Sequence, residues 1–288
     1  MAQVTRVQRA RLTQKIAVGI TGAAAAFIIA AALFLLVYIV VRGLPGISWA
    51  FLTEFPSGQM KEGGIYPVIV GTFYLIAFTA LFSLPVGVAA GIYLSEYAAR
   101  GPATRMIRLA ISNMAGVPSI VYGLFGLALF VILLDFGKSI LAGALTLACL
   151  TVPIIITATE EALRQIPSDL RQASLALGAT RWRTIYRIVL PAAGPGIVTG
   201  SILGLSRAAG ETAPILFTAA VYYKRQLPDS IFSDVMALPY HIYILATQVT
   251  GRPDDIIWGT ALVLVAGVTL LSVIAAAWRS KQRRKVRW

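Results

Sequence analysis

The sequence has very little of the side-chain chemistry from which disulfide frameworks, metal centres and catalytic triads are built. Its 288 residues include one cysteine, Cys149, and one histidine, His241. A single cysteine excludes an intrachain disulfide framework, and these two residues are too few for a Cys/His metal site. The sequence also has no Gly-x-Ser-x-Gly nucleophile elbow. We therefore expect no cofactor, no metal and no triad chemistry.

A nucleotide-binding loop is missing as well. Gly137-Lys138-Ser139 matches the end of the phosphate-binding pattern G-x-x-x-x-G-K-S, but Ile132 occupies the position of its first glycine. The chain therefore lacks the device that holds ATP phosphates. We expect it not to be an enzyme, and any ATP hydrolysis that it uses must take place in a separate chain.

Charge is scarce, and long apolar runs take its place. Charged residues make up 13% of the chain and hydrophobic residues 58%, with a mean hydropathy of +0.78. A helix needs about 20 apolar residues to cross the hydrocarbon core of a bilayer. The sequence predicts an all-α membrane protein with six spans: Ile16–Val41, Pro67–Leu94, Ile107–Leu134, Ser139–Thr159, Pro195–Tyr222 and Ile256–Trp278.

Lysine and arginine are distributed unevenly around these spans. One set of flanks carries eighteen: Arg6, Arg9, Arg11, Lys15, Arg100, Arg105, Arg108, Arg164, Arg171, Arg181, Arg183, Arg187, Arg279, Lys281, Arg283, Arg284, Lys285 and Arg287. The opposite flanks carry six: Arg42, Lys61, Lys138, Lys224, Arg225 and Arg252. Cations near span ends are retained in the cytosol. We therefore expect a multi-pass protein of the plasma (inner) membrane with both termini cytosolic, and the +13 net charge does not indicate a nucleic acid partner.

A polar segment, residues 160–191, separates the fourth and fifth spans on the cytosolic side. We expect the fourth helix to stop before Pro167, with Ser168 and Asp169 capping a short new helix. Gly178 is placed for a left-handed cap, and Thr180 for the cap of a second amphipathic helix. That helix is expected to end at Pro191, with Gly194-Pro195-Gly196 as a hinge before the fifth span. Such a hairpin either lies on lipid headgroups or binds a soluble partner.

The spacing of Ala173, Gly178 and Ile188-x-Leu190-Pro191 is similar to the EAA loop of binding-protein-dependent ABC importers. The permease subunits of that family insert this helical turn into a cleft of an ATPase. The resemblance assigns ATPase coupling to Gln172, Ala173, Gly178 and Ala179. The usual leading glutamate is Gln172 here, which retains the length and hydrogen-bonding capacity but not the charge.

Three further motifs narrow the resemblance. They are Tyr93-Leu-Ser-Glu-Tyr97, Gly116-Val-Pro-Ser-Ile-Val-Tyr-Gly-Leu-Phe-Gly126 and Ser206-Arg-Ala-Ala-Gly-Glu-Thr-Ala-Pro214. Together they resemble the PstA-type permease subunit of phosphate importers. The resemblance implies a type I ABC importer (MetI-like) fold, a heterodimer with a homologous permease, two copies of a cytosolic ATPase and an extracytoplasmic phosphate-binding protein.

An arginine and a glutamate lie inside the fifth predicted span. Arg207 is twelve residues from Pro195, about 18 Å along a helix and near the middle of a bilayer core. Glu211 is one turn further on, so the two can pair. A guanidinium suits an oxyanion, and a neighbouring carboxylate would weaken its grip. We expect a role in the substrate pathway or its gating, with a tie between or within helices as the alternative.

The sequence predicts three parts. Residues 1–15 form a basic cytosolic tail, residues 16–279 the permease domain with the coupling hairpin 160–191, and residues 280–288 a second basic cytosolic tail. The function is that of a phosphate importer permease. The alternatives are a permease for sulfate or molybdate, and a secondary transporter or channel that needs no ATPase. The external loop, residues 223–255, is either a docking surface for a binding protein or a packed loop.

Overall fold

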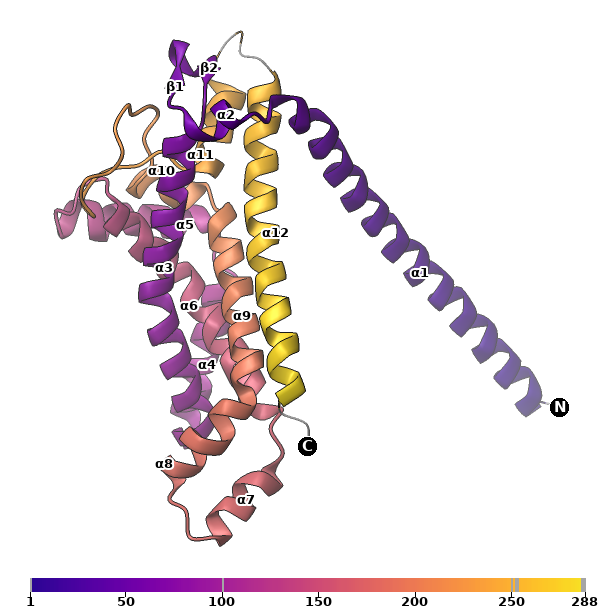
Figure 1. The fold of residues 1–288 in the computed structure, drawn as a ribbon. Coiled ribbons are helices and arrows are strands. Elements are labelled where there is room, and N and C mark those ends of the chain that lie inside the picture. Colours follow the sequence, from indigo (N-terminus) through magenta and orange to yellow (C-terminus); the bar gives the residue numbers. More distant parts are fainter. Residues whose placement is uncertain (1, 100, 250, 252–253, 286–288) are drawn as a thin grey trace.

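The protein is almost entirely helical, as the apolar runs predict (Figure 1). The computed structural model describes residues 2–99, 101–249, 251 and 254–285. Of the cations used to predict orientation, Arg100, Arg252 and Arg287 lie outside the described residues, as does the end of the 280–288 tail. Within the described part, the strands are two residues each, and β1 (Pro56–Ser57) pairs antiparallel with β2 (Glu62–Gly63).

The elements follow one another in a simple order. The helices of the first half are α1 Ala2–Gly43, α2 Trp49–Thr53, α3 Tyr66–Ile92, α4 Pro102–Ala115, α5 Ser119–Gly126 and α6 Ile140–Arg164. Those of the second half are α7 Ser168–Ala176, α8 Arg181–Thr184, α9 Leu190–Gly210, α10 Ala213–Thr218, α11 Leu238–Thr247 and α12 Asp254–Lys285. Short 3₁₀ turns lie at η1 Leu44–Gly46 and η2 Gly58–Met60, and π turns at η3 Tyr93–Tyr97, η4 Leu127–Leu133 and η5 Ile185–Val189.

Five continuous helices among the described residues are long and apolar enough to cross a membrane. They are Gln14–Gly46, Tyr66–Tyr97, Ile140–Arg164, Arg181–Gly210 and Asp254–Lys281. They correspond to the first, second, fourth, fifth and sixth predicted spans. The all-α, multi-span architecture is therefore confirmed.

The third predicted span, residues 107–134, is not one straight helix. It consists of α4 and the pair α5–η4, which are bent by 99° at a short break. The break falls at Gly116–Pro118, where Pro118 has φ −56° and ψ 137° outside the helical region. The pyrrolidine ring disfavours helical backbone in the residue before it, so the helix restarts at Ser119. The single span predicted over residues 107–134 is therefore interrupted at Pro118.

Helix α1 stands apart from the rest of the bundle (Figure 1). The C-terminal end of α1 contacts α12. There the rings of Tyr38 and Trp258 meet edge to face with centroids 5.0 Å apart. Gly43 lies so close to α12 that a Cβ there would be 2.5 Å from the Trp258 carbonyl oxygen. None of the most apolar stretch of α1 is buried against the rest of the described structure. The helix therefore exposes its apolar side chains on all faces.

The remaining long helices form the core. Helix α6 is the most buried of them, and it packs between α3 and α9 through Leu147, Ile155 and Leu163. In Figure 1 the hairpin of α7 and α8 lies at the same end of the bundle as the N-terminal end of α1 and the C-terminal end of α12. The β1–β2 hairpin, α2 and α11 lie at the opposite end. This arrangement agrees with a polar segment on one side of a membrane and a compact loop on the other.

Candidate functional site

The polar segment between the fourth and fifth spans forms a helical hairpin with a glycine corner. Helix α7 ends at Ala176, and Gly178 follows with φ +79°, a conformation that glycine adopts without strain. The Gly178 amide donates to the Leu175 carbonyl at 2.9 Å and the Ala179 amide to the Ser174 carbonyl at 3.2 Å. These two bonds make a Schellman cap. The left-handed cap predicted at Gly178 is confirmed.

The second helix of the hairpin begins as predicted and ends later than predicted. The Thr180 side chain accepts a hydrogen bond from the Arg183 amide, so its capping role is confirmed. The helix does not end at Pro191, because the π turn η5 precedes α9 and Pro191 falls in the first turn of α9, where a missing donor costs little. Helix α9 then continues to Gly210. The predicted hinge at Gly194-Pro195-Gly196 is therefore wrong.

The start of α7 also differs from the prediction. Pro167 occupies the N-cap position and contributes no side-chain bond, while Ser168 and Asp169 lie within the helix. The Ser168 hydroxyl donates to the Asp169 carboxylate at 3.2 Å. Proline sets an extended backbone that starts the helix without a polar cap, so the predicted capping by Ser168 and Asp169 is wrong.

The four predicted coupling residues lie at the exposed end of this hairpin. Gln172, Ala173 and Gly178 are exposed and Ala179 is half-buried. Large apolar side chains are exposed on the same hairpin: Leu177 is 89% exposed and Trp182 67% exposed, and Trp182 stacks on Tyr186 with ring centroids 6.1 Å apart. Apolar groups grouped at the tip of a polar hairpin are typical of a surface that another protein covers.

Buried ion pairs, which the sequence does not reveal, fasten the hairpin to the bundle. Glu96, in the π turn η3 that follows α3, is buried, and its carboxylate accepts from Arg171 of α7 at 2.8 Å. Arg181 of α8 donates to the Glu96 carbonyl and lies over the Tyr97 ring, 5.5 Å from its centroid. Within the hairpin, the hydroxyls of Ser174 and Thr184 are 2.8 Å apart.

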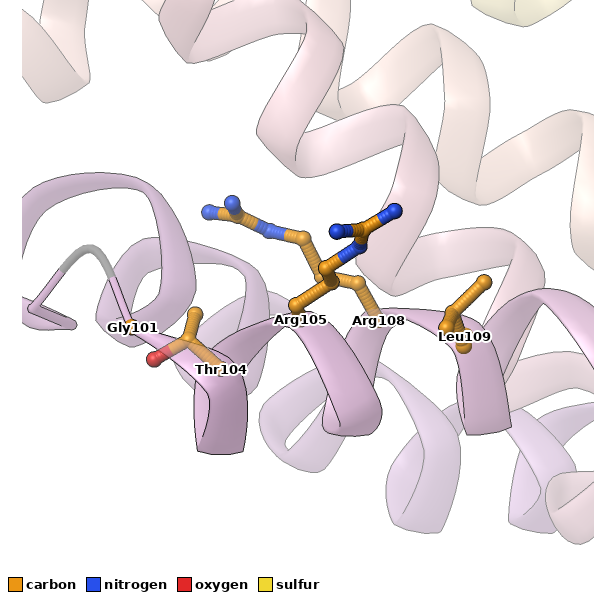
Figure 2. A pocket seen from close by; sticks show the side chains of 5 residues that line it. All are labelled: Gly101, Thr104, Arg105, Arg108 and Leu109. Carbon is orange, nitrogen blue, oxygen red and sulfur yellow. The ribbon is translucent and has the colours of Figure 1, made fainter.

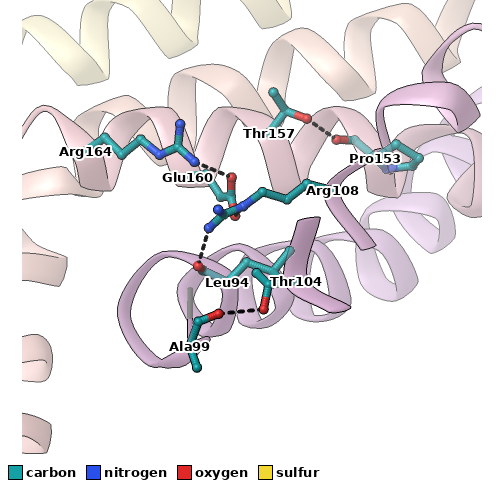
Figure 3. A network of polar contacts seen from close by, with 8 residues as sticks. All are labelled: Leu94, Ala99, Thr104, Arg108, Pro153, Thr157, Glu160 and Arg164. Carbon is teal, nitrogen blue, oxygen red and sulfur yellow. Dashed lines mark hydrogen bonds and ion pairs between the residues drawn. The ribbon is translucent and has the colours of Figure 1, made fainter. Parts of the chain in front are cut away.

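A second acid binds two arginines at the neighbouring helix end (Figure 3). The Glu160 carboxylate accepts from Arg108 of α4 and from Arg164 of α6, each at 3.2 Å. Arg108 also donates to the Leu94 carbonyl at 2.6 Å. Beside this network a cavity of about 340 Å³ is lined by Gly101, Thr104, Arg105, Arg108 and Leu109, and Figure 2 shows both arginines extended from the same face of α4. No local sequence pattern pairs these groups, although Glu96 and Glu160 are acids at span ends that are otherwise rich in cations.

Arg207 and Glu211 form the predicted ion pair. The Arg207 Nε and Glu211 Oε1 atoms are 3.3 Å apart, and the side chains are 49% and 16% exposed. Glu211 lies just past the end of α9, with φ −75° and ψ 126°, so the fifth helix is shorter than the predicted Pro195–Tyr222. The pair joins residues of one segment. In the described part of the chain no group of three or more His, Cys, Asp or Glu residues could hold a metal ion.

A contact between the neighbour of Arg207 and the last span shows where this pair lies along the bundle. Ser206, the neighbour of Arg207, lies 3.4 Å from Ser272 of α12, measured between the two hydroxyl oxygens. Ser272 is well inside the candidate span Asp254–Lys281. Glu211 lines a very small cavity together with Thr72, Ala208 and Pro239. The pair therefore lies between the two ends of the bundle, with Glu211 largely covered and Arg207 half exposed.

Comparison with known families gives this arrangement a context. Residues 84–288 match the model of the "Binding-protein-dependent transport system inner membrane component". The chain belongs to this family. The match covers α6, the hairpin, α9 and the Arg207–Glu211 pair.

Relatives of known name extend the similarity over nearly the whole chain. A probable ABC transporter permease protein, YqgI of Bacillus subtilis, is 36% identical over 280 residues, which cover 93% of this chain and 95% of that protein. The phosphate transport system permease protein PstA of Mycobacterium leprae is 37% identical over 257 residues, 88% of this chain and 84% of that protein. These proteins are permease subunits, so a transport subunit rather than an enzyme is confirmed for this family member.

Solved structures confirm the fold. A chain of the inward-facing MetNI methionine ABC transporter superposes with a TM-score of 0.62 at 18% identity, covering 78% of this chain and 99% of that one. A chain of a bacterial ABC transporter involved in the import of the acidic polysaccharide alginate superposes with a TM-score of 0.58 at 14% identity. The superposition covers 78% of this chain and 80% of that one. The family member described here therefore has the type I importer permease fold, and membership implies an ATPase and a substrate-binding protein as partners.

Proposed function

We propose that this protein is the permease subunit of an ATP-driven importer of inorganic phosphate, and that it forms half of the translocation pathway. The exposed hairpin with its Gly178 corner carries the proposal, because its shape fits the ATPase contact of this family. Phosphate is supported by relatives named as phosphate transport permeases, at 34–37% identity over most of this chain.

The proposed assembly contains two homologous permeases, this chain and a second one, set in the lipid bilayer of the plasma membrane. Two cytosolic ATPase subunits bind the coupling hairpins, and an extracytoplasmic phosphate-binding protein delivers the substrate. The positive-inside distribution supports a cytosolic hairpin and cytosolic termini, with tails at residues 1–15 and 280–288. The absence of a complete phosphate-binding loop in the sequence explains why a separate ATPase is needed.

The proposed mechanism is alternating access. Closure of the ATPase pair draws the two hairpins together, and the helices attached to them reorient between two states. Because η5 and α9 are continuous with α8, movement of the hairpin reaches Arg207 along one helix. The mechanism needs no chemistry in the permease itself.

Arg207 is the proposed phosphate contact in this pathway. Its pairing with Glu211 is confined to one segment, so the pair does not join two helices in the way that an interhelical tie would. Half of the guanidinium side chain is exposed and available to an anion, whose bidentate recognition suits arginine. Glu211 limits the affinity so that the anion is released, as conduction requires.

Substrate uptake by the reconstituted complex tests the proposal. Proteoliposomes with both permeases and the ATPase should accumulate labelled phosphate when the binding protein and ATP are supplied, and should not accumulate sulfate or molybdate. Uptake of another oxyanion in place of phosphate would reassign the substrate. Anion movement by the purified chain alone, without ATP, would favour a secondary transporter or channel.

A further inference from the structure

Three arginines from three different helices converge on one turn at the end of α3. This turn, Tyr93–Tyr97, is the π turn η3. It receives Arg108 of α4 at the Leu94 carbonyl, Arg171 of α7 at the Glu96 carboxylate, and Arg181 of α8 at the Glu96 carbonyl. The turn is therefore the place where the hairpin and the third span are both attached to the second span.

Arg171 has the most connections of the three. Besides the carboxylate of Glu96, its guanidinium donates to the Ile166 carbonyl at 2.7 Å and to the Leu163 carbonyl at 2.9 Å, at the C-terminal end of α6. One rigid, planar fork thus joins the ends of α3 and α6 to α7. Lysine has a single ammonium group and could not occupy these three positions with the same geometry.

Burial separates this pair from ordinary surface ion pairs. The side chain of Glu96 is 9% exposed and that of Arg171 25% exposed. A carboxylate with so little access to water depends on its partner, because removal of one charge leaves the other buried and uncompensated. The pair therefore resists separation when α7 moves.

Helix α7 has little else to hold it. Ser174 is its buried residue, and the hydroxyl of Ser174 contacts Thr184 within the same hairpin. A cavity of about 360 Å³ lies beside the pair, lined by Glu96, Arg171, Leu175, Arg181, Thr184 and Ile185. The apolar contacts around α7 thus leave space for it to shift, while the ion pair ties it to α3.

We propose that Glu96 and Arg171 are positioning residues that transmit movement of the coupling hairpin to the second and fourth spans. The inference rests on the proposed function, because it assumes that an ATPase moves the hairpin. With the pair intact, a displacement of α7 pulls the ends of α3 and α6 together. Without it, the ends of α3 and α6 follow the hairpin less closely, while the fifth span stays attached through the continuous helix of α8, η5 and α9.

A double-mutant cycle on the reconstituted importer tests the inference. Glu96→Gln, Arg171→Gln and the double variant are compared with the unmodified complex for ATP hydrolysed and phosphate taken up per ATP. Each single variant should lower uptake per ATP about tenfold while hydrolysis continues. A tenfold change lies within the range of typical coupling between two sites. The double variant should lose no more than the more severe single one, because both remove the same tie.

Two further variants guard against trivial outcomes. Arg105→Gln removes an exposed cation from α4 (Figure 2) and should retain the normal ratio. Arg171→Lys retains the positive charge but not the several donors of the guanidinium. Co-purification of the ATPase shows whether each variant complex assembles. If the glutamine variants do not assemble, the lysine variant decides: an intermediate loss of uptake per ATP supports the inference, and a normal ratio overturns it.

The outcomes for the two proposals differ. A complex that fails to take up phosphate before any substitution is made refutes the proposed function. A complex that takes up phosphate, but whose Glu96→Gln and Arg171→Gln variants retain the normal uptake per ATP, refutes the positioning role alone. Additive losses in the double variant also overturn it, since the two residues would then act separately.

Discussion

At the residue scale, the chain uses its few acids to hold its many cations. Glu96 and Glu160 are buried and each is bonded to arginine from another helix. Arg207 differs, because its partner Glu211 lies four residues away and half of its side chain is exposed. The first two arrangements are suited to holding helices, and the third to meeting a passing anion.

Replacement of Arg207 should therefore affect transport more than assembly. We expect Arg207→Ala to lower phosphate uptake about tenfold or more, the effect of losing a charge-assisted hydrogen bond, with Arg207→Lys less severe. Uptake in vesicles that contain equal amounts of the complex measures the effect. Normal uptake by an assembled Arg207→Ala complex would contradict the pathway role.

His241 gives stability a pH dependence. It lies in α11, outside the candidate spans, and its Nδ1 atom has no hydrogen-bond partner among the described residues. Burial lowers its pKa from 6.5 to about 4. A neutral buried histidine contributes its full stability above pH 6.5 and loses it as the pH falls toward 4, because the unfolded chain binds the proton more tightly. At pH 5 the loss is about 2 kcal/mol.

Thermal unfolding in detergent at pH 7.5 and pH 5 tests this expectation. The melting temperature should fall between the two values in the unmodified protein and fall less in His241→Gln, which carries no titratable ring. An equal fall in both proteins would show that His241 does not titrate in this range.

At the scale of elements, close backbone approach holds α9 against α6. A Cβ at Gly200 would lie 2.2 Å from the Cβ of Ala158, and one at Gly196 would lie 2.8 Å from the Cβ of Ala162. Small residues facing one another in this way let two membrane helices pack closely. At Gly194, on the same helix, such a Cβ would meet no atom of the described residues within 4 Å beyond its chain neighbours and the nearby backbone of its own helix.

This contrast provides a matched pair of substitutions. Gly200→Ala should destabilise the protein by about 1–3 kcal/mol, since an added methyl forces α6 and α9 apart. Gly194→Ala should be neutral or slightly stabilising, because alanine favours a helix interior. Melting temperatures in detergent measure both, and equal effects would argue against close packing at Gly200.

The corner of the hairpin can be tested through its backbone conformation. Gly178 has φ +79° and open space around it. Gly178→Asn should be tolerated, because asparagine adopts the left-handed region, whereas Gly178→Trp adds strain and bulk at the tip. We expect Gly178→Trp to abolish phosphate uptake while the ATPase retains its own hydrolysis. Normal uptake in that variant would remove the coupling role.

The sequence predicts a feature of these elements well when the residues that determine it are close together in the chain. Apolar runs locate the spans, and local backbone rules locate Gly178 and Thr180, because each signal lies within a few residues. Pro191 gives a wrong helix end, because the π turn η5 just before it lets the helix continue through the proline. The tie between Glu96 and Arg171 spans 75 residues and depends on how α3, α6 and α7 pack, which no local pattern contains.

At the scale of the whole molecule, the two ends of the bundle differ in what they expose. One end carries the hairpin with Leu177 and Trp182 at its tip. The other carries β1, β2 and the segment after α10, where Lys224 pairs with Asp234 at 2.6 Å and the Tyr223 hydroxyl donates to the Pro56 carbonyl. These contacts favour a packed external loop, with Phe232 exposed on it.

The proposed orientation can be tested with one thiol at each end. Leu177→Cys and Phe232→Cys are placed separately in a Cys149→Ser background, in cells that make the permease without the ATPase. A membrane-impermeant maleimide should label position 232 from outside and position 177 only in inverted vesicles. The reverse pattern would overturn the cytosolic placement of the hairpin.

The π turn at Ile185–Val189 has a consequence for the bearing of the hairpin. A π turn holds one residue more than an α turn in a similar rotation about the helix axis, so α8 and α9 keep nearly the phase that they would have in one regular α-helix. A residue deleted there would be absorbed as the turn converts to α-helix, whereas a residue deleted within α9 would rotate the hairpin by about 100° relative to the rest of that helix. The π turn is therefore a place where the chain can change in length by one residue while the tip of the hairpin keeps its direction.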